Sequence, residues 1–195
     1  MKKNNLLQKL LLILFVSCLF INNSFAQKSY IKNRWNIKLA YARYETGSYT
    51  FDNKAETTGQ IHFEADYGLL NFLEIGLYTG LANFYVIGTT QEPNQIVGTE
   101  VNTPFYGINA NFHILPFFIK ENDFRFDLYI SGKYGGMYFN TDDNYYYHGN
   151  ESEYGIGGGL SFYFTKHLGL YIEYTYGKYF FNDNDKLRYG ITFKF

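Results

Sequence analysis

Histidines and carboxylates recur at a spacing of two residues in the first half of this 195-residue sequence. His62, Glu64 and Asp66 alternate with apolar residues, and His113 has the same parity in a later segment. In an extended strand, residues two apart share one face, so these side chains would lie on one surface. Such groups could perform general acid–base chemistry. Because a buried histidine beside a polar neighbour is more often structural, we expect no catalytic residues here.

Two later segments concentrate oxygen ligands of the kind that Ca²⁺ and Mg²⁺ prefer. Residues 135–152 and 180–185 contain Asp142, Asp143, Asn144, Glu151, Asn182, Asp183, Asn184 and Asp185. Their spacing is not that of an EF-hand, so solvated acidic loops, with no metal or cofactor, are the simpler interpretation. The run from Tyr145 to His148 fits either an adhesive aromatic patch or an extended aromatic belt.

The composition excludes several classes of function. Cys18 is the single cysteine, which rules out a disulfide framework and any multi-cysteine zinc or iron–sulfur site. Aromatic residues make up 22% of the chain and charged residues 18%. The formal net charge is −1, so the chain lacks the basic footprint of a nucleic-acid-binding protein.

The first 26 residues are typical of a secretory signal peptide. The segment combines a positive start, an apolar stretch and a small-residue cleavage site: Lys2, Lys3 and Lys9, residues 10–21, and residues 24–26. The apolar stretch is shorter than the roughly 20 residues that a spanning helix needs. Cys18 lies inside it, and the residues before Cys18 match a lipoprotein signal poorly. We therefore predict Sec-type export, with residues 1–26 as signal peptide and residues 27–195 as one mature domain.

From residue 27 onward, apolar residues recur at every second position, which is the period of a β-strand. Eight segments show this alternation: residues 35–41, 61–67, 73–81, 106–114, 124–133, 154–164, 168–177 and 186–195. Counted with the residues that flank the shorter segments, the expected strands are about 9–13 residues long, close to the roughly 9–11 residues with which a tilted strand crosses a bilayer. The pattern therefore favours membrane-spanning strands over the strands of a soluble sheet.

The connections between these segments alternate between long and short. Long polar connections are expected near 45–59, 86–102, 135–152 and 180–185, and shorter ones near 68–72, 115–123 and 165–167. This asymmetry is typical of outer-membrane barrels, whose long loops lie outside the cell and whose short turns lie in the periplasm. We predict an all-β fold, an eight-stranded antiparallel up-and-down transmembrane β-barrel with both chain ends on the side of the short turns.

The positions that alternate with the apolar residues in the eight segments, which we call the polar parity, predict a filled lumen. They carry glycines, large rings and eleven charged residues: Lys38, Glu64, Asp66, Glu74, Arg125, Asp127, Lys133, Glu173, Lys186, Arg188 and Lys194. Glycine beside large rings suits a crowded interior better than a solvated surface. Because an unpaired ion away from water is heavily penalised, the near balance of signs predicts mutual pairing. A narrow ion or proton path is the alternative.

The apolar parity predicts a lipid-facing surface. Amphipathic rings favour the two headgroup levels of a bilayer. Rings are expected at the turn ends of the strands at Trp35, Phe124, Phe164, Phe193 and Phe195, and at the loop ends at Tyr41, Tyr106, Tyr134, Tyr154, Tyr176 and Tyr189. These positions predict two aromatic belts.

The last strand resembles the β-signal of outer-membrane proteins, polar-x-Gly-x-x-aromatic-x-aromatic. The matching residues are Arg188, Gly190, Phe193 and Phe195. Over the whole mature chain, the sequence resembles the small OmpA/OmpX-like outer-membrane β-barrel families of Gram-negative bacteria, without a periplasmic peptidoglycan-binding domain after the barrel. The resemblance implies that the outer-membrane assembly machinery reads this strand. It also implies an integral location in the cell outer membrane.

Members of these families serve in adhesion, envelope integrity and serum resistance. We therefore expect a monomer with a structural or surface-interaction role, and no nucleic acid as partner. Its expected partners are outer-membrane lipid, lipopolysaccharide and an external ligand at loops 135–152 and 180–185. A narrow porin-like channel for small solutes is one alternative. A lipid A-modifying barrel enzyme is another, but none of the four histidines is followed by the x-Ser that the deacylase type needs.

Overall fold

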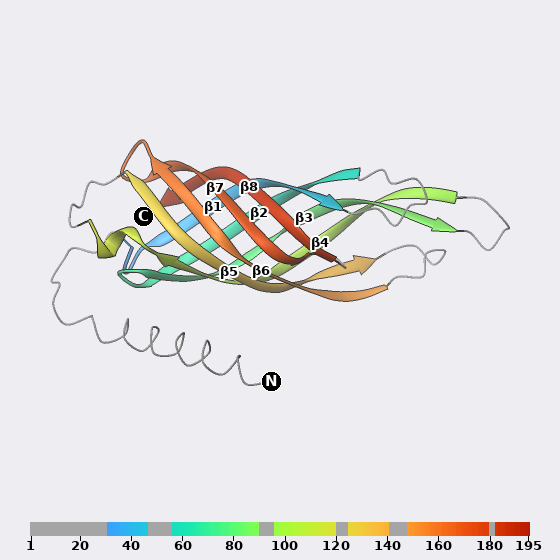
Figure 1. The fold of residues 1–195 in the computed structure, drawn as a ribbon, viewed down its shortest axis with the longest axis horizontal. Coiled ribbons are helices and arrows are strands. Elements are labelled where there is room, and N and C mark those ends of the chain that lie inside the picture. The colour runs from blue at the N-terminus through green and yellow to red at the C-terminus, as the bar shows by residue number, and fades with distance from the viewer. Residues whose placement is uncertain (1–30, 47–55, 90–95, 120–124, 141–147, 180–181) are drawn as a thin grey trace, which may run out of the picture.

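The computed structural model describes residues 31–46, 56–89, 96–119, 125–140, 148–179 and 182–195. These residues form one sheet of eight strands that closes into a barrel, as Figure 1 shows. In chain order the strands are β1 (Trp35–Thr46), β2 (Glu56–Leu70), β3 (Leu73–Thr89), β4 (Ile96–His113), β5 (Phe126–Asn140), β6 (His148–Tyr163), β7 (Leu168–Tyr179) and β8 (Asn182–Lys194). The predicted signal peptide, residues 1–26, lies outside the described residues.

Each strand pairs antiparallel with its neighbours in the chain, and the barrel is closed by the first and last strands. β1 and β8 pair from Asn36 with Lys194 to Arg43 with Leu187. Closure leaves no edge strand with unpaired backbone groups, which lipid could not satisfy. The predicted eight-stranded antiparallel up-and-down barrel is confirmed. Among the described residues, no helix is long and apolar enough to cross a membrane.

The strands are longer than the alternating pattern predicted, at 12 to 18 residues. Part of each predicted external loop pairs as strand, so that the residues between strands shrink to 47–55, 90–95, 141–147 and 180–181. An antiparallel ladder needs only backbone hydrogen bonds, so it continues where the apolar alternation stops. The expected loop bounds at these four places were therefore wrong.

The two ends of the barrel differ in how the strands are connected. At the end that we call the turn end, β2 and β3 are joined by two residues, Asn71 and Phe72, and β6 and β7 by residues 164–167. The third connection there contains a short 3-10 helix, η2 (Leu115–Phe117), which the alternating pattern did not predict. The C-terminus lies at the turn end (Figure 1). We call the opposite end the loop end.

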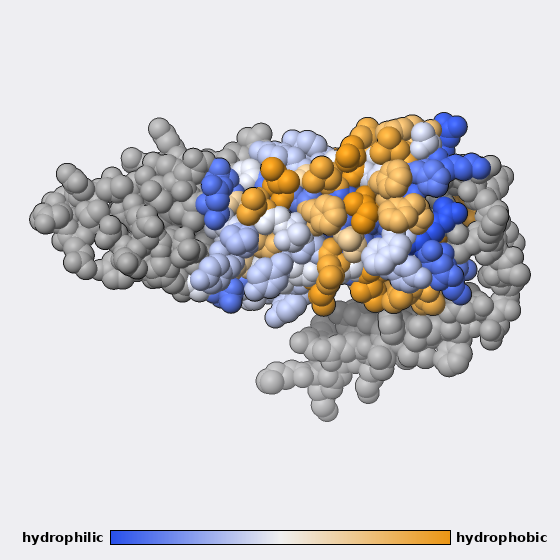
Figure 2. Space-filling view, turned by 180° about the vertical axis from the view of Figure 1, so that it is seen from behind, coloured by the Kyte–Doolittle hydropathy of each residue, from blue (hydrophilic) through white to orange (hydrophobic). Residues whose placement is uncertain are grey.

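The inward and outward faces follow the predicted parity. Inward side chains such as Lys38 and Glu64 are fully buried, whereas the outward side chains of Leu77 and Ile156 are 65% and 66% exposed. In Figure 2, apolar side chains form a band on the outside of the barrel, with strongly hydrophilic side chains beyond it at the turn end. Hydrophobic side chains in this position require lipid, because water would drive such a surface to aggregate.

Exposed rings lie at both ends of the apolar band. At the turn end, Trp35 packs against Tyr67 with ring centroids 5.2 Å apart, and Phe193 packs against Phe195 at 5.6 Å. At the loop end, Tyr41 and Tyr189 are 5.8 Å apart. The other predicted belt residues are also exposed: Tyr106, Tyr134, Tyr154, Phe164 and Tyr176. Phe124 lies outside the described residues.

Candidate functional site

The lumen collects the charged side chains of the inward parity. Ten of the eleven predicted lumen charges are buried there: Lys38, Glu64, Asp66, Glu74, Asp127, Lys133, Glu173, Lys186, Arg188 and Lys194. They come from six of the eight strands, and β6 supplies a further buried carboxylate, Glu153. The lumen is the candidate functional site because it concentrates the charged chemistry of the described residues.

Arg125 was wrongly predicted to lie in the lumen. It precedes the first residue of β5, Phe126, and its side chain is exposed at the turn end. Strand parity orients a side chain only while the sheet continues, and Arg125 is one residue beyond that limit.

Glu64 is the centre of the lumen network. Its carboxylate accepts hydrogen bonds from Lys38 Nζ at 2.9 Å and from Lys133 Nζ, so that one anion pairs with two lysines. The side-chain amide of Asn109 donates to the same carboxylate at 3.1 Å, and His62 Nε2 lies 2.9 Å from Glu64 Oε2. The central cluster, as we call Lys38, Glu64, Asp66, Lys133, Glu173 and Arg188, is built around this group.

The other two carboxylates of the central cluster are also paired with cations. Asp66 lies 2.9 Å from Lys38 Nζ, and accepts hydrogen bonds from Asn109 at 2.7 Å and Asn111 at 3.0 Å. Glu173 accepts a hydrogen bond from Arg188 Nη1 at 2.7 Å, and Lys133 Nζ is 3.4 Å away. This degree of pairing offsets the desolvation of buried charges.

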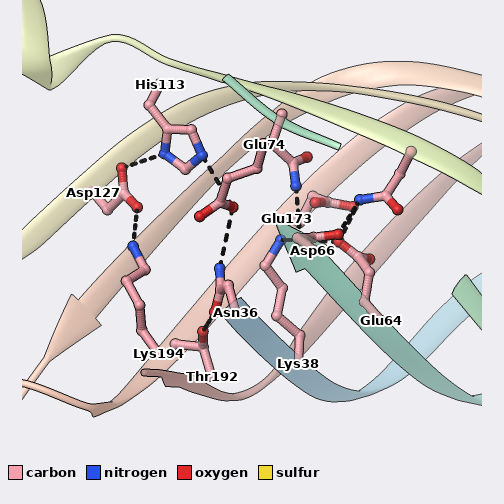
Figure 3. A network of polar contacts seen from close by, with 12 residues as sticks. Asn36, Lys38, Glu64, Asp66, Glu74, His113, Asp127, Glu173, Thr192 and Lys194 are labelled. Carbon is pink, nitrogen blue, oxygen red and sulfur yellow. Dashed lines mark hydrogen bonds and ion pairs between the residues drawn. The ribbon is translucent and has the colours of Figure 1, made fainter. Parts of the chain in front are cut away.

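A second group of polar side chains, the turn-end cluster, lies to the left of the central one in Figure 3. His113 bridges two carboxylates: its Nδ1 is 2.7 Å from Asp127 and its Nε2 is 3.1 Å from Glu74. Lys194 Nζ donates to Asp127 at 3.3 Å. The cluster is completed by Asn36, which donates to Glu74 at 3.3 Å, and Thr192, which donates to Asn36 at 2.6 Å.

A third group, the loop-end cluster, includes the carboxylate that the sequence interpretation missed. Glu153 accepts a hydrogen bond from the Tyr78 hydroxyl at 2.8 Å, and Lys186 Nζ is 3.6 Å from it. Glu153 lies between the expected loop 135–152 and the expected strand 154–164, and was assigned to neither. The alternation of Tyr154 and Ile156 continues to it, however, and would have placed it in the lumen. Every one of the five lumen cations thus lies 2.7–3.6 Å from a carboxylate within the described residues.

Rings and glycines fill the space between the charges, as the sequence predicted. Lys38 Nζ lies 4.8 Å from the centre of the Tyr129 ring, a cation–π distance. The Tyr129 ring lies where a Cβ on Gly159 would be, and the hydroxyl of Tyr78 has the same relation to Gly107. Glycine is needed at these two positions because any side chain would collide with a ring from another strand.

The sequence matches the family model of the outer membrane protein beta-barrel domain over residues 11–195. The chain belongs to this family. A search of curated proteins found no match.

Two solved structures show the same fold as this outer membrane protein beta-barrel domain. The outer membrane protein OprG from Pseudomonas aeruginosa is 10% identical, with 87% of this chain and 99% of that chain covered and a TM-score of 0.55. The N-terminal beta-barrel domain of Pseudomonas aeruginosa OprF is 16% identical, with 84% and 98% covered and a TM-score of 0.52. The chain is therefore an outer-membrane β-barrel.

In this outer membrane protein beta-barrel domain, the four residues of the predicted assembly signal lie on two faces of the last strand and just beyond its end. Arg188 points into the lumen toward Glu173, and Gly190 lies against the backbone of Leu39. Phe193 and Phe195 are exposed on the outside. Their recognition by the assembly machinery stays a prediction.

The predicted ligand-binding loops, 135–152 and 180–185, lie partly outside the described residues, and their described residues belong to strands. Residues 141–147, with Asp142, Asp143 and the tyrosine run, lie outside the described residues of the barrel domain. Residues 182–185 belong to β8 instead of a loop. Within the described ranges, no three His, Cys, Asp or Glu side chains are grouped so that they could hold a metal ion.

Proposed function

We propose that this outer-membrane barrel is a filled, non-conducting anchor that presents its loop-end segments for surface interactions. The observation that carries the proposal is the contact of side chains from distant strands across the lumen. Lys133 of β5 pairs with Glu64 of β2, Tyr78 of β3 with Glu153 of β6, and Lys194 of β8 with Asp127 of β5. Each pair joins strands three apart in the barrel, at three different levels of the lumen.

A barrel of eight strands is just wide enough for side chains to fill its interior. In this chain the filling consists of charges that hold one another in place. Because breaking one of these pairs leaves an uncompensated buried charge, the pairs resist the separation that an aqueous path would require.

The proposal predicts that the purified protein does not conduct ions across a planar bilayer. We expect no stepwise openings at voltages at which a porin, inserted in the same membrane as a control, gives clear steps. The physical reason is that hydrated ions would have to displace paired side chains at three levels of the lumen. Reproducible stepwise openings that require the inserted protein would contradict the filled-lumen proposal and favour a channel.

The channel alternative has one observation in its favour. Several buried polar atoms of the lumen, among them the side-chain amide of Gln60, Ser131 Oγ and the Tyr129 hydroxyl, have no hydrogen-bond partner among the described residues. Buried polar groups of this kind commonly bind water. A continuous row of such waters would make a narrow path for ions, and the conductance measurement distinguishes it from isolated waters.

We propose no enzymatic activity for this chain. The two histidines with carboxylate neighbours, His62 and His113, are at most 1% exposed and both are held in ion-pair distance of those carboxylates. A general acid or base must come within hydrogen-bond reach of its substrate, and a lipid at the outer surface would not reach them.

The proposed orientation follows from the connections. We infer that the turn end faces the periplasm and the loop end faces the exterior, after Sec-type export of the chain. Outer-membrane lipid and lipopolysaccharide would surround the aromatic belts of a monomer. The assembly machinery would read the last strand, and an external ligand would bind at the loop end.

A further inference from the structure

The turn end carries exposed positive charge that the lumen network does not use. Arg125 and Lys166 are exposed there, Arg34 is half-buried, and we call these three residues the basic arc. None of the three forms a side-chain ion pair with another described residue. Among the exposed described residues at this end there is no acidic side chain. Within the described residues, the basic arc therefore has no counter-charge on an exposed acidic side chain.

Backbone hydrogen bonds hold each residue of the basic arc in place. The turn that contains Arg34 is fastened to the end of β2, because Asn33 N donates to Gly68 O at 2.8 Å and Gly68 N donates to Arg34 O at 2.9 Å. Tyr163 N donates to Arg125 O at 2.7 Å. The turn around Lys166 is closed by Leu168 N, which donates to Thr165 Oγ1 at 2.8 Å. The cations are thus presented from fixed positions on the rim.

Each cation lies just outside an exposed ring of the turn-end belt. Arg34 precedes Trp35, Arg125 precedes Phe126, and Lys166 follows Phe164 by two residues; the three rings are 46%, 45% and 42% exposed. Rings in such belts lie at the headgroup level of the bilayer. One or two residues correspond to about 3–7 Å along a strand. The cations therefore lie near the level of lipid phosphates.

The loop end lacks this arrangement. Lys178, a cation outside the lumen whose side chain is described, lies 3.6 Å from Glu151, and Asp185 is exposed nearby on β8. Among the side chains that the structure describes, unpaired positive charge next to an exposed ring is therefore found at the turn end. It indicates an anionic partner in the leaflet that surrounds this end.

We propose that the basic arc binds the phosphate groups of anionic phospholipids in the leaflet at the turn end. A basic side chain near an anionic membrane surface contributes enough attraction to enrich such lipids by about threefold to fivefold. The arc extends from β5, through the turn between β6 and β7, to the start of β1, so that it contacts lipids around half of the rim. Zwitterionic lipids, with no net charge, gain less from the same contact.

Trp35 provides a local reporter because it is the single tryptophan of the chain and is adjacent to Arg34. The assembled protein would be placed in nanodiscs of equal phosphatidylglycerol and phosphatidylcholine, with bromine on the acyl chains of one lipid at a time. We expect brominated phosphatidylglycerol to quench Trp35 fluorescence about threefold more effectively per mole than brominated phosphatidylcholine. High salt should reduce this ratio, since it screens exposed charges.

Two substitutions that each remove one positive charge distinguish local lipid binding from the effect of the net charge of the protein surface. Arg34→Gln should bring the quenching ratio close to one, whereas Arg125→Gln should leave it unchanged, because β5 lies four strands from β1 around the barrel. The reporter can be moved to β5 by combining Trp35→Phe with Phe126→Trp. In that background, Arg125→Gln should bring the quenching ratio close to one, and Arg34→Gln should leave it unchanged. The unboiled gel mobility of every variant verifies that the barrel has formed.

Equal quenching by the two lipids in the parent protein would overturn the proposal, and would indicate that an acidic periplasmic partner neutralises the arc instead. Equal loss of the ratio in Arg34→Gln and Arg125→Gln would also overturn it, because the preference would then arise from net charge. A loss confined to the variant beside the reporter supports direct binding.

Discussion

Replacement of Glu64 by glutamine should lower the free energy of unfolding by about 3–5 kcal/mol, the usual cost of removing one partner from a buried ion pair. The change preserves the shape of the side chain but removes the counter-ion that Lys38 and Lys133 share. Both lysine side chains are at most 1% exposed, so water does not compensate them. Urea unfolding in phospholipid vesicles, followed by Trp35 fluorescence, would measure the effect.

A matched control is available at the loop end. Glu151 pairs with Lys178 at 3.6 Å, with the two side chains 22% and 30% exposed, and Glu151→Gln should cost only about 0–1 kcal/mol. Adding Lys133→Met to Glu64→Gln should restore about 1–3 kcal/mol of the free energy of unfolding, because the double variant also removes one of the two lysines that lost Glu64 as a counter-ion. Equal stability of the two glutamine variants would contradict the view that the central cluster organises the lumen.

Loss of Phe195 should reduce the amount of assembled protein in the outer membrane several-fold. Phe195 is the last residue of the predicted assembly signal, and it also closes the barrel: Trp35 N donates to Phe195 O and Phe195 N donates to Trp35 O, both at 2.9 Å. Deletion removes the ring and both hydrogen bonds. The folded fraction in outer-membrane preparations, measured on unboiled gels, would report the loss.

Two substitutions separate recognition of the ring from closure of the barrel. Phe195→Ala keeps both backbone hydrogen bonds and removes the ring, so it should lower assembly in cells almost as much as deletion, while refolding into detergent micelles remains near the parent level. Phe195→Tyr retains an aromatic ring and should assemble normally. Parent levels of Phe195→Ala in the outer membrane would refute the assignment of Phe195 to an assembly signal.

The barrel and its two faces were predictable from the sequence for a physical reason. Lipid on the outside and packed charges on the inside require opposite kinds of side chain at successive residues. The alternation alone therefore assigned Lys38 and Glu173 to the lumen, and Leu39 and Tyr174 to the lipid-facing surface. The prediction was wrong for Arg125, because parity has no meaning beyond the end of a strand. It missed Glu153 because β6 begins within a segment that polar composition had assigned to a loop.

Mutual pairing of the lumen charges was predicted from their balanced signs, but the individual partners were not predictable. The contact of Lys133 with Glu64 joins β5 to β2, and depends on the relative register of all the strands between them. Alternation determines which face a residue occupies but leaves its height in the barrel open. Similarly, the strand extensions at the loop end carry no apolar alternation, so the sequence offered no signal for where β3 ends and β4 begins.

A comparison of unboiled and boiled samples on SDS gels, after separation of outer membranes from soluble protein, tests most directly whether the chain forms a closed membrane barrel. Pairing of β1 with β8 leaves no edge at which detergent could open the sheet, so the unboiled protein from the outer-membrane fraction should migrate faster than the boiled protein. Recovery of the mature chain as soluble protein, or identical migration of the two samples, would contradict the closed barrel in the outer membrane.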